Sequence, residues 1–585
     1  MKRVMVNVAW PYVNGEIHPG HLAGYLVPSD IIARYHRLAG DDVLMVSGSD
    51  CYGTPTTVQA DKEGISPGDV VKKYHKAHRV DLFRHYGLSY NLYTKTTTKI
   101  HKKVVHDMFL DLLKNGYITK GVMKQYYSVS DKQFLPDRYV EGICPHCNAK
   151  DQRSDQCESC GRWLEDGELI NPKSKLTGAK VILKDTEHYF LAFDKLEGKL
   201  RGYLKTKKGV WKKWVWAEAD GWLREGLKRR AITRDLDWGI SLPLGEIKKL
   251  PRNKQLSDYT GKRIYVWWEA VIGYISATKE WSKRVSGDIK GDDSEVIFSH
   301  YKGQSKSWRE FWLNKNALHY YFMGQDNLVF HTLMWPAQLI GSKNDYTLPK
   351  YVVVNKFMNY EGKKFSKSRN WTIDLWGMAK EFGVDPIRYY ISANLPENKE
   401  GNFTWKEFVS SVNNELVANI GNFIHRTLTF AKSRFKGRIP EGKLEKSVQF
   451  EIKDAFVDAG ELLEQASITE ALQRIMKFVS FANKYFDRKQ VWSVVKEDKK
   501  LAGEILFNCI QLVDSLRILL MPYLPHAMER LSTMLNAKTV EPQVGKKYWK
   551  LSRIKSGERL VEIKPLFNKL DMKEVEEKKK SLGSS

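Results

Sequence analysis

The chain of 585 residues is several times longer than a typical domain, so we expect two or more domains with an ample buried core. Its 95 Lys and Arg exceed its 69 Asp and Glu, and the net charge of +26 is typical of proteins that bind a phosphate-rich partner such as nucleic acid. A basic surface that only confers solubility is the alternative. The sequence lacks a run of about 18 apolar residues and an apolar segment long enough for secretion, which excludes a membrane span and predicts a cytoplasmic protein.

The first elements predicted along the chain form a βαβ unit. A buried strand at 4–9 leads through a Gly-bearing turn into helical spacing at 18–38, interrupted at Pro28, and a second strand follows at 42–46. Such a unit predicts a parallel sheet with a right-handed crossover. Further strands of the same sheet are expected at 264–268, 320–323 and 351–354.

The later parts of the chain differ in character. An insertion at 117–236, rich in Gly, Pro and Lys, is expected to split the sheet domain. From about residue 405, long helical periodicities replace the strand patterns and predict a helical bundle, with helices at 414–432, 448–465, 468–487 and 500–521. The charged run near the C-terminus is expected to be a solvated helix or a frayed tail.

Four of the six cysteines form two tight pairs, Cys144-x-x-Cys147 and Cys157-x-x-Cys160. Pairs of this kind supply the four soft ligands that structural zinc takes in a tetrahedron. All four positions would be thiolates, so the metal would hold the insertion together and leave no open position for chemistry. Four unconnected thiols are the alternative, and a disulfide framework does not suit a reducing compartment. The sequence therefore predicts one structural Zn²⁺.

His18-Pro19-Gly20-His21 lies where the first strand turns into its helix. A helix N-terminus offers unpaired N–H groups and partial positive charge, which suit a polyphosphate. Two imidazoles three residues apart share a helical face, and Gly20 lets a ligand approach the backbone. In isolation the tetrapeptide is equally typical of a packed or metal-binding histidine pair.

A lysine-rich loop with the sequence GKKFSKS spans residues 362–368 and follows a predicted strand. The ammonium groups of Lys364 and Lys367 can close on a triphosphate and neutralise charge as pyrophosphate leaves. A loop of this composition in isolation is usually only solvated. Its position after the histidine turn, across most of a split α/β domain, makes a shared phosphate site the better interpretation.

The two motifs together resemble the HIGH and KMSKS signatures of class I aminoacyl-tRNA synthetases. Successive blocks between about residues 4 and 390 resemble methionyl-tRNA synthetases: AWPYVNGEIHPGH, GSDCYGTP, FLPDRYVEG, YVWWEAVIGY, FMGQDNLVFHTLMWPA, KKFSKS and GVDPIRYY. The blocks ANIGNFIHR and ANKYFDRKQVW resemble the anticodon-binding bundle of that family. The resemblance implies an α/β fold with a split Rossmann-like parallel-sheet catalytic domain, a zinc-knuckle insertion and an α-helical anticodon-binding bundle.

The resemblance also implies the division of the chain. The expected parts are a first catalytic half at 1–116, the insertion at 117–236, a second catalytic half at 237–345, a KMSKS-loop and stem-contact region at 346–404, the helical domain at 405–540 and a C-terminal tail at 541–585.

The activity implied is that of a methionine–tRNA ligase. It would activate L-methionine with ATP and Mg²⁺ to methionyl-adenylate, and then transfer it to the 3' end of initiator and elongator tRNA(Met). Residues that match the family's ATP site are His18, Gly20, His21, Asp326, Lys364, Ser366 and Lys367; the two histidines and two lysines would be catalytic. Phe365 replaces the family's common Met, and Gln325 stands where many relatives have Lys before the Asp.

A methionine pocket is implied by a further set of matches: Trp10, Tyr12, Asp50, Trp267, Ala270, Val271, Tyr274, Phe330 and His331. Aromatic walls suit a polarisable thioether, and a phenol or imidazole donor can mark the sulfur. Asp50 matches the carboxylate that takes the substrate's ammonium. Read without the family, the aromatic residues would more often be ordinary core.

The family's anticodon contacts match Asn422, Arg426 and Trp492. Asn422 and Arg426 are four residues apart, so one helical face would present an amide and a guanidinium to unstacked bases. Trp492 would stack on the first anticodon base. A lone Trp near a helix end is more often a core residue.

Three other classes of protein share part of this pattern. A small-molecule nucleotidylyltransferase shares the HxGH turn but has no need of the helical half. A noncatalytic tRNA-binding relative should have lost one phosphate motif, and both are present. Isoleucyl, leucyl and valyl enzymes carry a large editing domain, for which an insertion with a zinc knuckle leaves little room. With no appended dimerisation module recognised, we expect a monomer.

Overall fold

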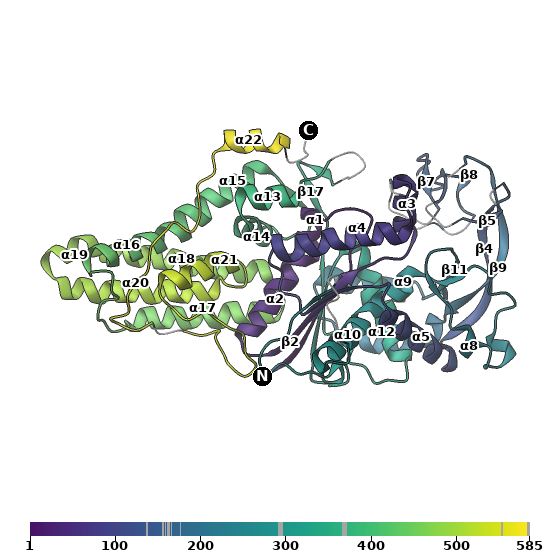
Figure 1. Cartoon of the computed structure of the whole chain (residues 1–585), viewed down its shortest axis with the longest axis horizontal. Helices are drawn as coiled ribbons and strands as arrows, with labels where there is room; N and C mark the ends of the chain where they lie inside the picture. Colours follow the sequence, from purple (N-terminus) through teal and green to yellow (C-terminus); the bar gives the residue numbers. More distant parts are fainter. Residues whose placement is uncertain are drawn as a thin grey trace.

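The computed structural model describes residues 1–130, 132–135, 139–154, 157, 159–160, 164, 167–175, 177–289, 296–365, 371–551 and 554–581. Figure 1 shows the central sheet between the helical bundle at one end of the molecule and the insertion at the other. The division into a sheet domain followed by helices is the one expected from the sequence. Within the described residues, no helix is long and apolar enough to cross a membrane.

The central sheet has six strands in the order β14-β3-β2-β1-β15-β16. All neighbouring pairs are parallel except β14 with β3. The strands are β1 (Arg3–Val8), β2 (Asp42–Ser49), β3 (Leu92–Lys95), β14 (Ile297–Phe298), β15 (Leu318–Gly324) and β16 (Tyr351–Asn355). The predicted parallel sheet with its βαβ start is confirmed.

One predicted strand of this sheet is wrong. Residues 264–268 do not join the sheet: Lys262–Ile264 forms β13 in a small antiparallel sheet with β11 (Thr233–Asp235) and β12 (Ile240–Ser241), and α9 (Val266–Glu269) follows. A short apolar run has the same periodicity whether it is a buried strand or a buried helix, so the pattern could not separate the two.

Helical structure after β1 is continuous through α1 (Pro19–His21), the π-helical turn η1 (Leu22–Leu26) and α2 (Val27–Leu38). Pro28 does not interrupt it, contrary to the sequence prediction. The proline stands at the second residue of α2, directly after the π-helical turn, and the carbonyl of Gly24, four residues before it, accepts from the side-chain amide of Asn355 in place of a backbone N–H.

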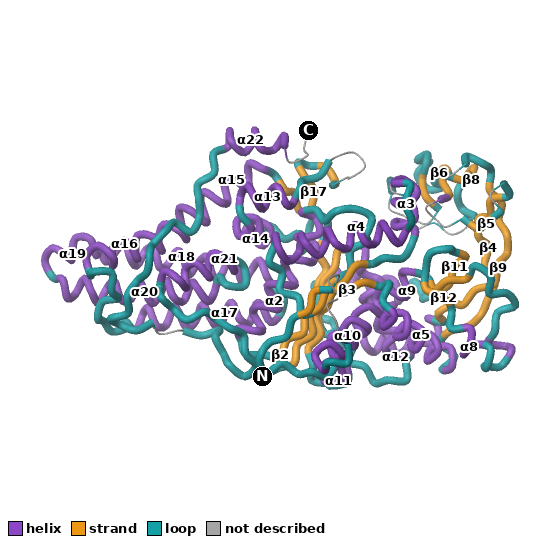
Figure 2. Tube along the Cα trace, in the orientation of Figure 1, coloured by secondary structure: helices purple, strands orange, loops and turns teal. Residues whose placement is uncertain are grey.

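Both faces of the sheet are covered (Figure 2). Successive residues of β15 point to opposite sides: the hydroxyl of Tyr320 donates to the carbonyl of Glu464 in the bundle, whereas the ring of Tyr321 packs on Tyr274. The helices on the Tyr274 side are α5 (Lys99–Lys114), α10 (Gly273–Ser286) and α12 (Trp335–Gly341).

The insertion is built on a long antiparallel ribbon of β4 (Ile118–Ser128) and β9 (Val181–Leu191). Its distal part carries a three-stranded sheet of β6 (Val140–Ile143), β7 (Gln152–Arg153) and β8 (Ile170–Ser174), which holds the cysteine pairs. This distal part has its own small core, separate from the main one.

The helical half contains the four helices expected and several short ones. α18 buries Ile468, Ala471, Leu472 and Ile475, the helical spacing that predicted it. The helices of the bundle are η10 (Val412–Gly421), α16 (Asn422–Arg434), α17 (Lys446–Glu464), α18 (Ile468–Lys489), α19 (Val491–Glu497), α20 (Lys499–Leu519) and α21 (Pro525–Met534). Between sheet and bundle lie α13 (Leu375–Phe382), α14 (Val384–Ala393) and α15 (Trp405–Ser411).

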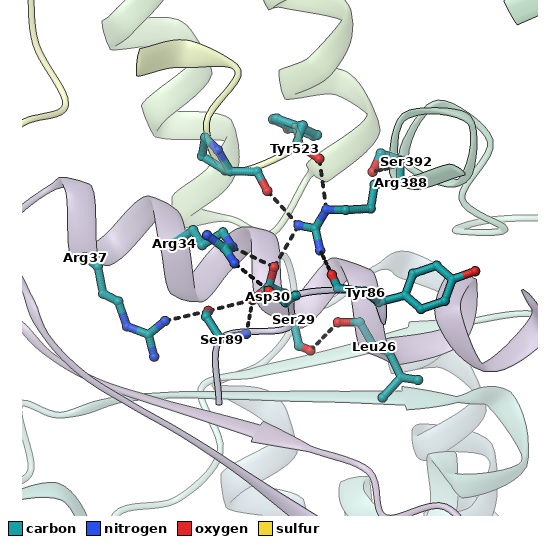
Figure 3. A network of polar contacts seen from close by, with 12 residues as sticks. Leu26, Ser29, Asp30, Arg34, Arg37, Tyr86, Ser89, Arg388, Ser392 and Tyr523 are labelled. Carbon is teal, nitrogen blue, oxygen red and sulfur yellow. Dashed lines mark hydrogen bonds and ion pairs between the residues drawn. The ribbon is translucent and has the colours of Figure 1, made fainter. Parts of the chain in front are cut away.

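A buried ion pair joins the bundle to α2 (Figure 3). Arg388, fully buried on α14, lies 2.7 Å from the Asp30 carboxylate and donates to the carbonyl of Tyr523 at the end of the bundle. Ser89 donates to the other oxygen of Asp30. Burial alone would raise the pKa of Asp30, but Arg34 and Arg388 hold it below its usual range. The carboxylate therefore stabilises the junction at neutral pH, and that stabilisation is lost as pH falls.

The segment after α21 returns to the sheet domain. Trp549 is buried, its indole N–H donates to the carbonyl of Phe456 in α17, and its ring packs edge-on against Tyr35 of α2. A last helix, α22 (Met572–Ser581), contains the charged run and is tied to α13 by an ion pair between Lys578 and Glu381.

Candidate active site

A cavity of about 350 Å³ opens at the carboxyl ends of β1, β2 and β15, the edge at which open parallel sheets bind their ligands. Most of the residues predicted for ATP and methionine line it: Trp10, Tyr12, His18, Gly20, His21, Asp50, Ala270, Val271, Tyr274, Asp326, His331 and Lys364. Trp267 and Phe330 lie behind this lining, and Ser366 and Lys367 fall outside the residues that the structure describes.

The two histidine rings of the HPGH turn lie together, with centroids 3.9 Å apart. The backbone N–H of Gly20 donates to Nδ1 of His18, and that of His18 donates to Nδ1 of His21. Because each Nδ1 accepts a hydrogen bond, a neutral ring carries its proton on Nε2. Each Nε2 is then a donor, which is the polarity that phosphate oxygens require.

Gly20 is required by the packing of this turn. A Cβ there would lie 2.9 Å from the His18 ring and 3.5 Å from Phe365. Any larger residue would push the ring of His18 away from its backbone donor.

The lysine-rich loop begins in a tight hairpin beside the cavity. β17 (Met358–Tyr360) pairs with β18 (Lys363–Lys364) across Glu361 and Gly362, which both have positive φ, as a two-residue hairpin turn of this type requires. The side chain of Lys364 is exposed. The turn thus brings a cation to the mouth of the cavity.

Phe365 connects the two phosphate motifs. Its ring stacks on His18, with centroids 4.9 Å apart, and on Tyr360 at 5.6 Å. Sequence reasoning treated this residue only as a tolerated replacement for Met. The signal for this contact in the sequence was the aromatic side chain itself, because a flat ring can stack on an imidazole.

Asp50 lies at the end of β2 with its backbone fixed on both sides. Its N–H donates to the carbonyl of Pro11, and its carbonyl accepts from the N–H of Val13. The side chain is only 4% exposed, and within the described residues Oδ1 has no hydrogen-bond partner. Burial raises the pKa of Asp50 well above its usual value, and negative charge on the nearby Glu269 carboxyl would raise it further. A bound cation such as an ammonium would offset that cost.

Aromatic side chains form one wall of the cavity. The indole N–H of Trp267 donates to the hydroxyl of Tyr12, 3.0 Å away. The ring of Phe330 packs on Trp267 with centroids 5.3 Å apart. The hydrogen bond fixes the Tyr12 ring, and Phe330 supports Trp267.

His331 and Tyr274 form a buried polar pair in the same wall. Nδ1 of His331 lies 2.9 Å from the carbonyl of Asn327, and Nε2 lies 2.7 Å from the hydroxyl of Tyr274. A carbonyl only accepts, so the proton is on Nδ1 and Tyr274 donates to Nε2. Burial lowers the pKa of His331 to about 4, so the ring is neutral at physiological pH. The pair presents polar atoms without a charge, which suits an uncharged substrate side chain.

Two glycines that sequence reasoning did not select make room for Trp10. A Cβ on Gly48 would lie 2.5 Å from the indole ring, and one on Gly273 would lie 2.8 Å from it. Gly48 stands inside β2, and an isolated glycine within a strand is a signal of close approach by another group. Trp10 is thereby held between the sheet and α10.

The residues predicted to read the anticodon lie on α16 and α19, helices of the bundle on the side away from the sheet (Figure 1). The guanidinium of Arg426 lies 4.6 Å from the ring of Phe486 and 5.6 Å from that of Trp492, and pairs with Asp487 at 3.1 Å. Asn422 is exposed one turn earlier on α16. Trp492 is 40% exposed, so part of its ring is available to a ligand.

The four cysteines of the insertion come together in space. Their Sγ atoms all lie within 4.8 Å of one another, with Cys144 and Cys160 at 3.9 Å and Cys147 and Cys157 at 3.5 Å. Four thiolates about 2.3 Å from a zinc ion at tetrahedral angles would be about 3.8 Å apart. The cluster can therefore bind a metal ion.

Comparison with known proteins agrees with this geometry. A family model described as "tRNA synthetases class I (M)" matches residues 4–428, and one described as "Anticodon binding domain of methionyl tRNA ligase" matches residues 438–585. The chain belongs to the methionyl group of class I aminoacyl-tRNA synthetases. It is therefore an aminoacyl-tRNA ligase.

Individual relatives of this synthetase match over nearly the whole chain. A methionine–tRNA ligase of Roseiflexus castenholzii is 39% identical, covering 97% of this chain and 96% of the relative. One from Bacillus mycoides is 36% identical, covering 98% of each. The solved Mycobacterium tuberculosis methionyl-tRNA synthetase in complex with methionyl-adenylate has a TM-score of 0.75 at 21% identity, covering 97% of this chain and 100% of that one, and shows the same fold.

Proposed function

We propose that this synthetase joins L-methionine to tRNA(Met) in two steps. The amino acid's carboxylate attacks the α-phosphate of ATP, pyrophosphate leaves, and the terminal ribose hydroxyl of the tRNA then takes the acyl group. No step needs an enzyme nucleophile, so positioning and charge stabilisation can supply the rate. The observation that carries the proposal is the single cavity in which the HPGH turn, Asp50 and the aromatic wall meet.

Each wall of the cavity has a separate role. His18 and His21 donate from Nε2 to the phosphates, and Asp326 takes the ribose of the nucleotide. Asp50 receives the ammonium of methionine. The ring of Tyr12 and the neutral pair of Tyr274 and His331 enclose the thioether.

The lysines of the loop act on the leaving group. Lys364 reaches the mouth of the cavity, and Lys367, three residues on, would join it at the pyrophosphate. Ser366 adds a hydroxyl for the same phosphates. Mg²⁺ would arrive with ATP and neutralise part of its charge.

The cysteine cluster is proposed to hold one structural Zn²⁺ through Cys144, Cys147, Cys157 and Cys160. An all-thiolate set with these separations supports zinc and leaves no open coordination position. Six cysteines without a disulfide support a reducing location such as the cytoplasm. We propose that the enzyme acts as a monomer.

The tRNA is proposed to lie along the molecule, with its 3' end at the cavity and its anticodon at Asn422, Arg426 and Trp492. Arg426 would hydrogen-bond a base edge and Trp492 would stack on the first anticodon base. Initiator and elongator tRNA(Met) share that anticodon, so both would be substrates.

The proposal is tested by ATP–pyrophosphate exchange with each of the twenty amino acids. Exchange with methionine alone, followed by charging of tRNA(Met), is the expected result. Exchange with another amino acid in place of methionine would contradict the assignment of the aromatic pocket.

A further inference from the structure

A second carboxyl group, Glu269, lies behind the cavity and has no role in the mechanism above. It ends α9, is 0% exposed, and lies close enough to Asp50 to influence its charge. Its Oε2 lies 2.6 Å from Nε2 of His101 on α5, whereas its Oε1 has no partner among the residues described. An ionised carboxylate with a bare oxygen in the interior is costly, so the surroundings favour the neutral acid.

The position of the protons follows from the other side of His101. Nδ1 of His101 lies 2.8 Å from Oγ of Ser276, and that hydroxyl donates to the carbonyl of Gly273. A hydroxyl has one proton, so Oγ must accept from Nδ1 and Nδ1 carries a hydrogen. The contact between His101 and Glu269 then contains one further proton. Burial lowers the pKa of His101 to about 3 and raises that of Glu269, so this proton stays on the carboxyl group.

The charged groups around the pair do not reverse this assignment. On α10, Glu280 favours a charged His101, but it is already paired with Arg284 and accepts from Thr94. On the β2 side, Asp50 and Tyr52 face Glu269, and neither supplies a positive charge. In the described part of the chain no Lys or Arg contacts Glu269.

We propose that Glu269 is a positioning residue that acts as a neutral carboxylic acid, donating to His101, so that it adds no second negative charge beside Asp50 when Asp50 ionises against the substrate's ammonium. One ammonium then meets one negative charge. The inference rests on the proposed function only for the identity of that substrate.

The pair of Glu269 and His101 also supports the part of the cavity wall that Trp10 forms. The ring of His101 lies 6.2 Å from that of Trp10, which fills the space between Gly48 and Gly273. Loss of the hydrogen bond from Glu269 would free His101 to tilt and Trp10 to shift. The effect would fall on methionine binding and leave the nucleotide side unchanged.

Two substitutions separate a neutral acid from an ionised one. Glu269→Gln keeps a neutral donor to Nε2 of His101, so KM for methionine in pyrophosphate exchange should change by about threefold or less. Glu269→Ala removes the donor and should raise that KM by about tenfold, with KM for ATP unchanged. If Glu269→Gln raises KM as much as Glu269→Ala does, the neutral-acid assignment is wrong.

A spectroscopic test needs no activity. The infrared difference spectrum between parent and Glu269→Gln should contain the C=O stretch of a protonated carboxyl group, and that between parent and Glu280→Gln should not, because Glu280 is ion-paired with Arg284. A Glu269→Gln difference without that band would overturn the inference. A parent enzyme that shows the band but no exchange with methionine would refute the proposed function and leave the protonated Glu269 standing.

Discussion

The proposed methionine cavity, which contains Trp10 and Asp50, and the proposed anticodon cluster of Asn422, Arg426 and Trp492 differ in how far their side chains are exposed. In the cavity, Trp10 is wedged between two glycines and Asp50 is 4% exposed, whereas Trp492 in the cluster is 40% exposed. A small substrate can be recognised only by enclosure, which needs residues from many parts of the chain. RNA bases can be recognised on an open surface, where one helical hairpin supplies the contacts.

The largest effect should follow from changing the charge inside the cavity. Asp50→Asn keeps the shape but leaves the ammonium of methionine without a counter-ion, so kcat/KM for methionine should fall by about 1000-fold in pyrophosphate exchange. In the parent, KM for methionine should rise as pH falls, because protonation of Asp50 removes the same charge. That pH dependence should disappear in Asp50→Asn.

Trp492→Ala is the counterpart of this experiment at the other end of the molecule. It should leave the amino acid-dependent exchange unchanged. A loss of exchange in Trp492→Ala would mean that the two regions are not independent.

A second change tests the loop at the mouth of the cavity. Lys367→Ala should slow adenylate formation by about 100-fold with methionine binding nearly unchanged, because the ammonium acts mainly in the transition state. Lys363→Ala is the matched control, since its Nζ lies over the ring of Trp371, and should retain parental exchange. Equal rates for Lys367→Ala and the parent would remove Lys367 from the mechanism.

The sequence predicts the long elements of secondary structure better than the short ones. The strands of the sheet and the long helices were predictable because their apolar periodicities are long, as in α18. The segment 264–268 was not predictable, because a short apolar run fits helix and strand equally. In the folded chain the side-chain amide of Gln338 donates to the carbonyl of Trp268, a tertiary contact that no local pattern contains. Pro28 was misread because a π-helical turn leaves no local pattern.

The site shows the same limit. The motifs identified residues that line the cavity, but not the residues that hold those side chains in place. Phe365 on His18, Gly48 beneath Trp10 and Glu269 on His101 are contacts between segments far apart in the chain. No local spacing contains such information. The cysteine pairs are the opposite case, because two short Cys-x-x-Cys spacings predict the four thiols that come together in space.

A smaller effect is expected from the anticodon cluster. Trp492→Ala should reduce kcat/KM for charging tRNA(Met) by about tenfold, within the 1 to 3 kcal/mol that base stacking is worth, while thermal stability stays close to the parent. Phe450→Ala, which removes an exposed aromatic residue on α17 of the same bundle, should leave charging unchanged. Parental charging by Trp492→Ala would rule out the stacking role. A large loss of stability would instead make the residue part of the core.

The smallest effect on catalysis should come from the zinc site. Cys157→Ser should abolish stoichiometric zinc in metal analysis of the purified protein, because one of the four thiolates is lost. The cluster lies in a distal part of the insertion with its own small core, so pyrophosphate exchange should change by about twofold or less, as for distant sites that share no partners. Loss of zinc should loosen the insertion, and this should appear first as proteolysis within the insertion, before the sheet unfolds. Cys509→Ser, at a buried cysteine outside the cluster, should retain full zinc content. Full zinc content in Cys157→Ser would refute the ligand assignment, and a collapse of exchange would show that the insertion helps to shape the methionine cavity.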